Sequence, residues 1–248
     1  MLTFKQMVIL GFKKIGYEIK KTPLSITPGY EKIESSYSTY APWSMDNEFK
    51  RVYDIIYPYT MVDIYRCYEL WQLISQIKKV DGAIIEVGVW KGGTAGIICK
   101  KAEFENLDKK IYLADTFKGV AKASNKDERY KGGEHSDTSV KIVSSLLSDK
   151  LNLINFKILE GIFPDETGHL IDENVFSFCH IDVDTYDSAK DIVDWIWPKL
   201  MIGGIIVYDD YGFIGTNGVT RYVNEEALKK DRLVIHNLNA HGIVIKLK

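Results

Sequence analysis

The chain has 248 residues, of which 46% are hydrophobic and 27% are charged, so it can form a sizeable hydrophobic core. Its formal net charge of -2 gives no overall attraction to nucleic acid or to an anionic membrane, and we expect no nucleic-acid partner. The apolar runs are far shorter than the ~18 residues that a membrane-spanning helix needs, so we expect no membrane span.

The first 60 residues are expected to form an N-terminal extension that combines a helix with a lid. Apolar residues at helical spacing predict an amphipathic helix that packs on the domain or on a second subunit of a homo-oligomer; these residues are Leu2, Met7, Leu10, Phe12 and Ile15. Residues 20–46 contain three of the six prolines, which is typical of a long loop or lid.

The cysteines indicate a reducing compartment. Cys67, Cys99 and Cys179 are odd in number and far apart, which argues against a disulfide framework and against a structural zinc site. The N-terminus also has no small-residue cleavage pattern of a signal peptide. Together these features favour a cytoplasmic location.

From residue 61 onward, helical and extended segments alternate. Apolar residues at helical spacing predict a helix over 61–79, which Asp81-Gly82 ends. Short runs rich in β-branched residues predict strands at 83–89, 110–115, 156–160, 175–183, 204–208, 232–238 and 242–247. Helical spacing predicts further helices at 93–104, 137–147, 186–200 and 218–230.

This order predicts an α/β fold with a seven-stranded sheet. The first five strands are separated by helices, so they should be parallel, with right-handed crossovers and helices on both faces. The last two strands are joined by a short turn region at 239–241, so they should form an antiparallel hairpin at the sheet edge. Five parallel strands with a terminal hairpin are typical of the Rossmann-like class I methyltransferases, and we assign residues 61–248 to such a domain.

A glycine-rich turn follows the first strand and predicts a cofactor site. The turn reads E-x-G-x-x-x-G-G and includes Glu86, Gly88, Trp90, Lys91, Gly92, Gly93 and Thr94. Trp90 stands where a dinucleotide binder needs a glycine beneath the pyrophosphate, so a ligand without a pyrophosphate, such as S-adenosylmethionine, fits better. Glu86 can accept from the ammonium of this ligand, and the loop amides with the helix start can bind its carboxylate.

The second strand ends in residues that suit a nucleoside. A carboxylate such as Asp115 can accept hydrogen bonds from both hydroxyls of a ribose, and it lies 22 residues after Gly93, close to the ~20 expected. Thr116 and Phe117 follow, and the Phe117 ring is a candidate neighbour of the adenine.

Three carboxylates end the fourth and fifth predicted strands. Asp182 ends the fourth, and Asp209 with Asp210 ends the fifth. Because these strands should be neighbours, their carboxyl ends would bring the three side chains within a few ångströms of one another. Such carboxylates repel each other unless a cation lies between them, and oxygen ligands favour Mg²⁺ or another divalent cation.

Three readings stay open on the residues alone. Asp184, just before the helix at 186, is a candidate helix cap. His180 is either a partner of a ligand carboxylate or a satisfied core histidine. The loop residues Lys118, Lys122, Lys126, Arg129 and Lys131 either meet a phosphorylated or nucleotide-linked acceptor or form a solvated face.

These motifs resemble the macrocin-type O-methyltransferase family, which methylates sugar hydroxyls in antibiotic and polysaccharide pathways. The resemblance spans roughly residues 57–225, in the segments Tyr59–Met61 with Arg66, Ile85–Gly93, Asp115–Gly119, His180–Tyr186 and Gly203–Tyr211. Thr116 stands where the family usually has serine. The first 50 residues match no segment of the family, so we expect acceptor specificity to lie there.

The resemblance implies a role for each matching residue. Asp182, Asp209 and Asp210 match the metal ligands, and Asp182 also matches the general base. The segment Tyr59, Thr60 and Met61 matches one that closes over the cofactor. Ser139, Gly161 and Phe163 match residues on the adenine side.

The sequence therefore predicts a metal-dependent O-methyltransferase that uses S-adenosylmethionine and acts on a small-molecule acceptor, a sugar. Two alternatives remain: an O-methyltransferase of a non-sugar small molecule, and a nicotinamide-dependent sugar reductase, which would need a glycine in place of Trp90. A metal-dependent phosphoryl-transfer enzyme would need a P-loop, which the sequence lacks. A non-catalytic oligomerisation module would leave the acidic residues unexplained.

Overall fold

The computed structural model describes residues 3–15 and 40–248. The chain divides into two compact units, 1–39 and 40–248. Within the first unit, residues Phe4–Lys14 form helix α1, which confirms that the N-terminal apolar segment is helical. Leu2 and most of the predicted loop at 20–46 lie outside the described residues, and the packing of α1 on another surface stays a prediction.

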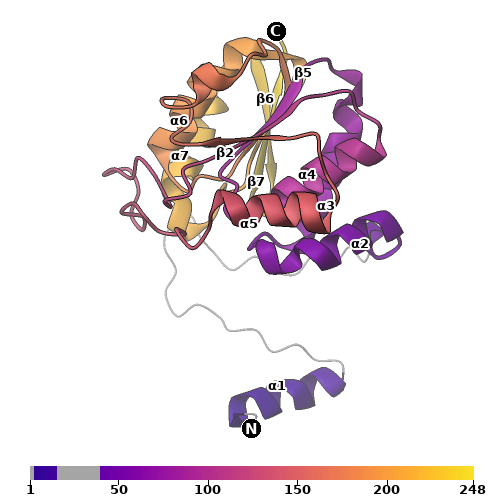
Figure 1. Ribbon diagram of the computed structural model, residues 1–248. Coiled ribbons are helices and arrows are strands. Elements are labelled where there is room, and N and C mark those ends of the chain that lie inside the picture. Colours follow the sequence, from indigo (N-terminus) through magenta and orange to yellow (C-terminus); the bar gives the residue numbers. More distant parts are fainter. Residues whose placement is uncertain (1–2, 16–39) are drawn as a thin grey trace. The chain divides into compact units, whose positions relative to one another are not determined.

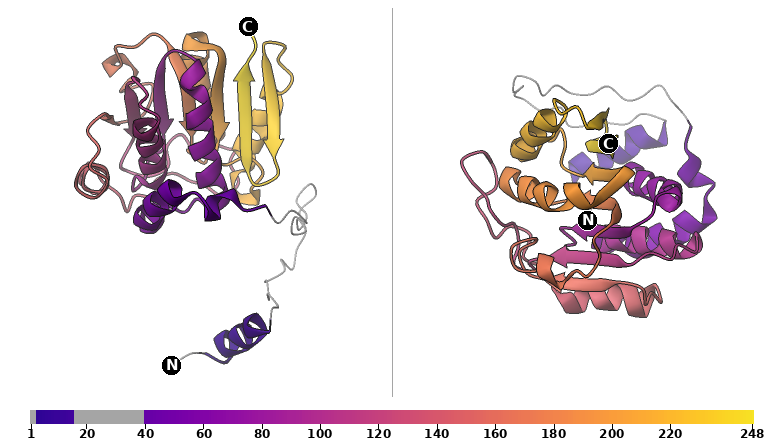
Figure 2. Two further views of the ribbon diagram at one scale, coloured as in Figure 1. Left: turned by 90° about the vertical axis from the view of Figure 1, so that its right-hand side faces the viewer. Right: turned by 90° about the horizontal axis from the view of Figure 1, so that it is seen from above.

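The second unit is built on one seven-stranded sheet (Figures 1 and 2). The strands are β1 (Ala83–Val87), β2 (Ile111–Asp115), β3 (Lys157–Glu160), β4 (Phe176–Ile181), β5 (Leu200–Tyr208), β6 (Arg232–Asn237) and β7 (His241–Lys246). Their order is β3-β2-β1-β4-β5-β7-β6. Strands β1 to β5 pair in parallel, whereas β7 pairs antiparallel with both β5 and β6. The predicted fold class and the adjacency of the fourth and fifth strands are confirmed.

Helices cover both faces of the sheet (Figure 1). Helices α2 (Asn47–Ile56), α3 (Ile64–Gln76), α4 (Gly93–Phe104) and α5 (Val140–Ser144) contribute to the apolar core on one face. Helices α6 (Tyr186–Ile196) and α7 (Asn217–Glu226) cover the other. Strands β1, β2 and β4 are thus buried on both sides, as their apolar runs predicted, whereas the edge strand β3 exposes Lys157 and Glu160.

Helix α2 belongs to the same core as the sheet, although it precedes the predicted domain start at residue 61. Phe49, Val52 and Ile56 are fully or almost fully buried, and Phe49 packs edge-on against the Trp71 ring of α3. As a functional division into extension and methyltransferase domain, the boundary at residue 60 stays a prediction.

Capping residues move several helix boundaries from their predicted positions. The helix expected from residue 61 begins at Ile64, because the Asp63 carboxylate accepts from the backbone amides of Tyr65 and Arg66. The helix expected from 137 begins at Val140, where Ser139 caps the Ile142 amide, and it continues as a π-helical turn, Ser145–Lys150.

Short turns end other helices early. The helix predicted to reach Leu200 stops at Ile196, because Pro198 lies in the 3₁₀ turn Trp197–Lys199 and has no amide hydrogen to donate. Similar 3₁₀ turns are Pro42–Ser44, Tyr57–Tyr59, Ile77–Lys79, Gly168–Leu170 and Ile214–Thr216. Strand β5 begins at Leu200 rather than 204, and its register with β4 shifts between Phe176 and Phe178.

The C-terminal hairpin turns one residue earlier than predicted. His241, expected in the turn, is the first residue of β7 and pairs with Asn237. The turn itself uses Ala240 in a left-handed conformation, with φ 70°. This register buries the His241 side chain completely, next to the end of β5. No helix in the described ranges is long and apolar enough to cross a membrane.

Candidate active site

A cavity of about 390 Å³ lies where the parallel strands end. Most of the predicted site residues line it: Tyr59, Thr60, Met61, Gly88, Trp90, Thr94, Asp115, Thr116, Gly161, Phe163, Asp182, Asp209 and Asp210. Six others do not: Glu86, Lys91, Gly92, Gly93, Phe117 and Ser139. The structure therefore brings Asp115 and Thr116, predicted to contact a nucleoside, and the three carboxylates to one cavity, as the strand order predicted.

Glu86, which was predicted to bind the ammonium group of the cofactor, does not line the cavity. Its side chain is fully buried and forms an ion pair with His180, with 2.8 Å between Oε1 and Nδ1. Its Oε2 has no hydrogen-bond partner. His180 is thus buried between Glu86 and Asp209, whose Oδ1 lies 3.8 Å from its Nε2, so both predicted readings of this histidine stay open. A contact between Glu86 and a ligand ammonium stays a prediction.

Gly88 lets the first and fourth strands end side by side. It has φ 89°, and a Cβ there would lie 1.7 Å from the carbonyl oxygen of Asp182. The Asp182 amide also donates to the carbonyl of Val87, at 2.9 Å. The absence of a side chain at Gly88 therefore permits the backbone contact that places Asp182 at the cavity.

The absence of a side chain at Gly93 leaves space for the segment Tyr59–Thr60. A Cβ at Gly93 would lie 2.5 Å from the Cβ of Thr60 and 2.7 Å from the carbonyl oxygen of Tyr59. The segment Tyr59–Thr60 therefore packs directly on the first turn of α4, where it forms part of the cavity wall. Gly92, the N-cap of the same helix, has φ 90° and faces Val143 of α5.

Asp115 connects the loops that follow β1 and β2. One carboxylate oxygen accepts from the backbone amides of Val89 and Trp90, at 2.7 and 2.8 Å, and the other accepts from the Phe117 amide at 2.6 Å. These three bonds hold the glycine-rich turn in place while Asp115 still lines the cavity. Trp90 and Lys91 turn outward to the Asp137 carboxylate.

The carboxylates of Asp182, Asp209 and Asp210 gather as predicted. One ligand atom from each lies within 4.8 Å of the others. Burial and the neighbouring charges of Asp209 and Asp210 raise the pKa of Asp182 well above its usual value. Burial with the charges of Asp184 and Asp209 raises the pKa of Asp210 in the same way.

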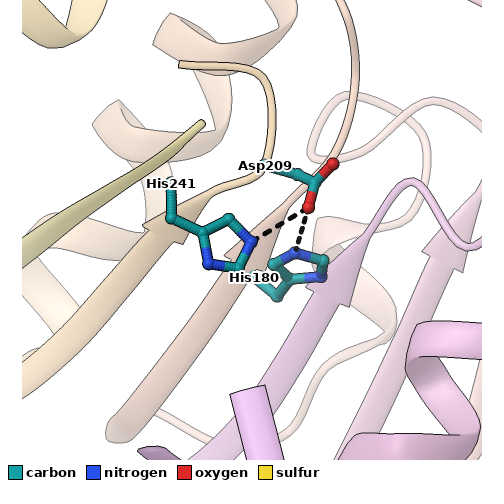
Figure 3. A group of neighbouring side chains, drawn as sticks. All are labelled: His180, Asp209 and His241. Atoms are coloured by element: carbon teal, nitrogen blue, oxygen red, sulfur yellow. Dashed lines mark hydrogen bonds and ion pairs between the residues drawn. The ribbon is translucent and has the colours of Figure 1, made fainter. Parts of the chain in front are cut away.

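Asp209 differs from the other two because protein cations surround it (Figure 3). His241 Nε2 lies 3.0 Å from its Oδ1, and Arg66 Nη1 donates to its Oδ2. Although burial opposes ionisation, the rings of His180 and His241, whose Nε2 atoms lie 3.8 and 3.0 Å from Oδ1, and the charge of Arg66 hold the pKa of Asp209 well below its usual range. Burial alone would lower the pKa of His180, but Asp209 and Glu86 raise it to about 10.

Asp184 is part of the cavity and does not cap helix α6. Its backbone amide donates to Asp210 Oδ2 at 2.9 Å, and it adopts φ 63°. The first amide of the helix, that of Tyr186, instead donates to Asp127. Burial raises the pKa of Asp184, although a hydrogen bond from the buried Tyr130 opposes the rise. A fourth carboxylate therefore faces the same space.

Two residues of the predicted basic loop form ion pairs within the chain. Lys122 pairs with Asp165 and Asp191, and Lys126 pairs with Asp187. Two of the five predicted cationic residues are therefore in surface ion pairs, and the reading as an acceptor site rests on Arg129, which lines the cavity.

Two residues in contact behind the carboxylate cluster, Glu69 and His241, carry no motif that sequence reasoning could use. Glu69 lies on α3 and His241 at the hairpin, 172 positions apart, and their side chains are in contact. A histidine next to an apolar strand is a weak signal, because most such residues serve the core.

The sheet order and the position of the cavity define the class I methyltransferase fold. Solved structures share it: the O-methyltransferase NovP has a TM-score of 0.64 at 22% identity, covering 77% of this chain and 82% of NovP. CalS11, a calicheamicin methyltransferase, has a TM-score of 0.61 at 14% identity, covering 87% and 99%.

The chain belongs to the Macrocin-O-methyltransferase (TylF) family, whose profile matches residues 47–241. It is 26% identical over 167 residues to demethyldecarbamoylnovobiocin O-methyltransferase of Streptomyces niveus, covering 62% of each protein. It is 25% identical over 169 residues to mycinamicin III 3''-O-methyltransferase of Micromonospora griseorubida, covering 62% of this chain and 65% of that protein. The matches thus span less than two thirds of these relatives' length.

Proposed function

We propose that this protein is an S-adenosylmethionine-dependent O-methyltransferase that methylates a sugar hydroxyl with the help of a divalent cation. One observation carries this proposal. A single cavity is lined at one place by Asp115 and the turn after β1, and at another by Asp182, Asp209 and Asp210. A nucleoside-bearing methyl donor and a hydroxyl held at the carboxylates would therefore meet in one enclosed space.

The cofactor would be held by residues from four segments. Asp115 suits the ribose hydroxyls, and the backbone of Gly88 and Trp90 borders the same part of the cavity. Thr60 and Phe163 line other parts of the wall. S-adenosylmethionine supplies a methyl group on a sulfonium sulfur, so the protein contributes mainly by positioning the two reactants.

The carboxylate cluster fits a divalent metal by its chemistry. It offers oxygen ligands only, which suits Mg²⁺ or a similar hard cation. Burial raises the pKa of Asp182 and of Asp210, so their ionised forms need a compensating positive charge. A cation bound there supplies Lewis-acid assistance that lowers the pKa of an acceptor hydroxyl.

Asp182 is the proposed general base. Its side chain lines the cavity, and the hydrogen bond from its amide to Val87 holds it at the end of β4. From there the carboxylate can accept the proton of an acceptor hydroxyl. Asp184 provides a second carboxylate in the same cavity, so the effect of replacing Asp182 is to be compared with the effect of replacing Asp184.

A transfer assay tests the proposal. The protein is incubated with methyl-labelled S-adenosylmethionine, Mg²⁺ and a panel of sugar acceptors: nucleotide sugars, glycosides and oligosaccharides. Transfer to at least one sugar is expected, with a loss of ~10²–10⁴-fold in Asp182→Asn and a loss on chelator treatment that Mg²⁺ restores. Asp187→Asn, which removes a surface ion-pair partner, is the control and should keep full activity.

Each part of the proposal can fail separately. Methyl transfer only to non-sugar phenols would replace the acceptor class and keep the reaction. Activity that survives both the chelator and Asp210→Asn would remove the metal from the proposal. The cytoplasmic location, the absence of a nucleic-acid partner and the homo-oligomer stay predictions alongside it.

A further inference from the structure

Behind the carboxylate cluster, Glu69 and His241 form a buried chain of contacts that ends on Asp209. The His241 ring is fully buried and lies between two carboxylates, with Nδ1 on Glu69 Oε2 and Nε2 3.0 Å from Asp209 Oδ1. Glu69 comes from α3, His241 from β7 and Asp209 from the end of β5. Asp209 Oδ1 is thus in contact with His241, and His180 Nε2 lies 3.8 Å from the same oxygen (Figure 3). Glu69 contacts the other nitrogen of the His241 ring.

Glu69 is itself held by the hairpin. Asn237, the strand partner of His241, donates from its side-chain amide to Glu69 Oε1, so both Glu69 oxygens have a partner in β6 or β7. The hairpin turn adds a bond from Asn239 to Asp63, the N-cap of α3, at 3.1 Å. The orientation of the His241 ring is therefore determined by contacts at both ends.

The other Asp209 oxygen is occupied as well. Arg66, also from α3, donates to Oδ2 and to the Asp209 carbonyl oxygen, the latter at 3.2 Å. With Arg66 on one oxygen and His241 on the other, the carboxylate plane has a single orientation. That orientation places one Asp209 oxygen within 4.8 Å of a carboxylate oxygen of Asp182 and of Asp210.

We propose that Glu69 and His241 are positioning residues that orient Asp209 as a metal ligand. The inference rests on the proposed function, because it assigns these residues to the same metal site. Partners that orient a ligating side chain typically contribute 10- to 100-fold in metal affinity. His241 acts through Asp209 and lines no part of the cavity itself.

The probe is Mn²⁺, whose binding is measured by electron paramagnetic resonance on the full chain saturated with S-adenosylhomocysteine. His241→Leu removes both contacts, and we expect its Mn²⁺ affinity to fall 10- to 100-fold while its affinity for S-adenosylhomocysteine stays within about twofold. His241→Gln keeps an amide donor near the Nε2 position and should recover most of the lost affinity. Glu69→Gln tests the far end of the chain of contacts and should give an intermediate loss.

Glu226→Gln is the matched control. Glu226 is a fully buried carboxylate paired with Arg232 of β6, so this variant loses a buried ion pair at the same hairpin without touching Asp209. It should lower the melting temperature and leave Mn²⁺ affinity unchanged. An equal loss of Mn²⁺ affinity in Glu226→Gln, or an unchanged affinity in His241→Leu, would overturn the positioning role alone. A wild-type protein that binds no Mn²⁺ would overturn the positioning role and the proposed metal site together.

Discussion

At the residue scale, two neighbouring strand ends depend on one position that has no side chain. Gly88 combines φ 89° with a backbone contact to Asp182 that leaves no space for a Cβ. The glycine that sequence reasoning assigned to the cofactor therefore also serves the carboxylate cluster. Its substitution should disturb both halves of the cavity.

We expect Gly88→Ala to lower the free energy of unfolding by about 2–4 kcal/mol, because backbone strain and overpacking add. Gly133→Ala is the control. Gly133 has φ 88°, and a Cβ there would meet no atom of the described residues within 4 Å. Only the backbone strain of the alanine, about 1 kcal/mol, therefore applies. Urea unfolding measures both values, and equal losses in the two variants would contradict the close-contact explanation.

Asp115 gives a second prediction at this scale. Asp115→Asn replaces one oxygen by an amide that faces backbone N–H donors, so the turn after β1 loses its anchor. We expect the affinity for S-adenosylhomocysteine to fall about 10- to 100-fold, measured by isothermal titration calorimetry. Thr116→Ser, which keeps the hydroxyl, should bind normally. Unchanged binding by Asp115→Asn would remove Asp115 from the cofactor site.

The positions of the site residues were predictable from the sequence only where a strand end determined them. Asp182, Asp209 and Asp210 follow apolar strands, and the parallel topology brings them together without further information. Glu86 lies inside its strand and meets His180 across the β1–β4 pair, which strand alternation alone does not reveal. Glu69 and His241 are joined only by tertiary packing, so no local pattern predicts their contact.

At the element scale, α3 and α4 are joined by one carboxylate. Glu105, the C-cap of α4, accepts from Lys101, from Ser75 of α3 and from Lys78 just after α3. The bonds from Lys101 and Ser75 lower the pKa of Glu105 to about 2. Both helices carry residues of the cavity, so this link supports the site from outside.

The lowered pKa makes a prediction about pH. Because the folded pKa lies below the unfolded value of 4.5, the stabilisation is complete above about pH 4.5 and is lost as pH falls toward 2. Glu105→Gln should therefore reduce the unfolding free energy by about 0.5–1 kcal/mol at pH 7, and this difference from wild type should shrink between pH 5 and pH 3. Urea unfolding at several pH values measures it.

Glu103→Gln is the matched control on the same helix. Glu103 forms one ion pair, with Lys100, and is about half exposed, so its loss should cost less than that of Glu105. A difference between Glu105→Gln and wild type that stays constant from pH 7 to pH 3 would contradict the assignment of the acid-sensitive stability to Glu105.

The type and order of the elements were predictable, because the spacing of apolar residues separates helices from strands and the connection rules allow few sheet topologies. Five strands separated by helices predict parallel pairing, and strands β1 to β5 pair in parallel. Boundaries were less predictable, since they depend on single capping contacts such as those of Asp63 and Ser139. The π-helical turn at Ser145–Lys150 has no sequence signature that separates it from an ordinary helix.

At the scale of the whole molecule, binding of a ligand should raise the free energy of unfolding. A ligand at 100 times its dissociation constant adds about 2.7 kcal/mol to the folded state. For a unit the size of residues 40–248, that corresponds to a rise of about 5–10 °C in melting temperature. We expect this rise with S-adenosylhomocysteine and none with NAD. The reverse result in a thermal-shift assay would favour the sugar reductase.

The hairpin contact with Asp209 has a consequence for biosynthesis. The carboxylate cluster draws on residues from 66 to 241, and its last contributor enters only when β7 pairs with β5. A nascent chain that has exposed only β1 to β5 on the ribosome contains every parallel strand, yet its Asp209 lacks the contact with His241. Under the proposed function, the full cation affinity is therefore expected only after translation has delivered the final strand.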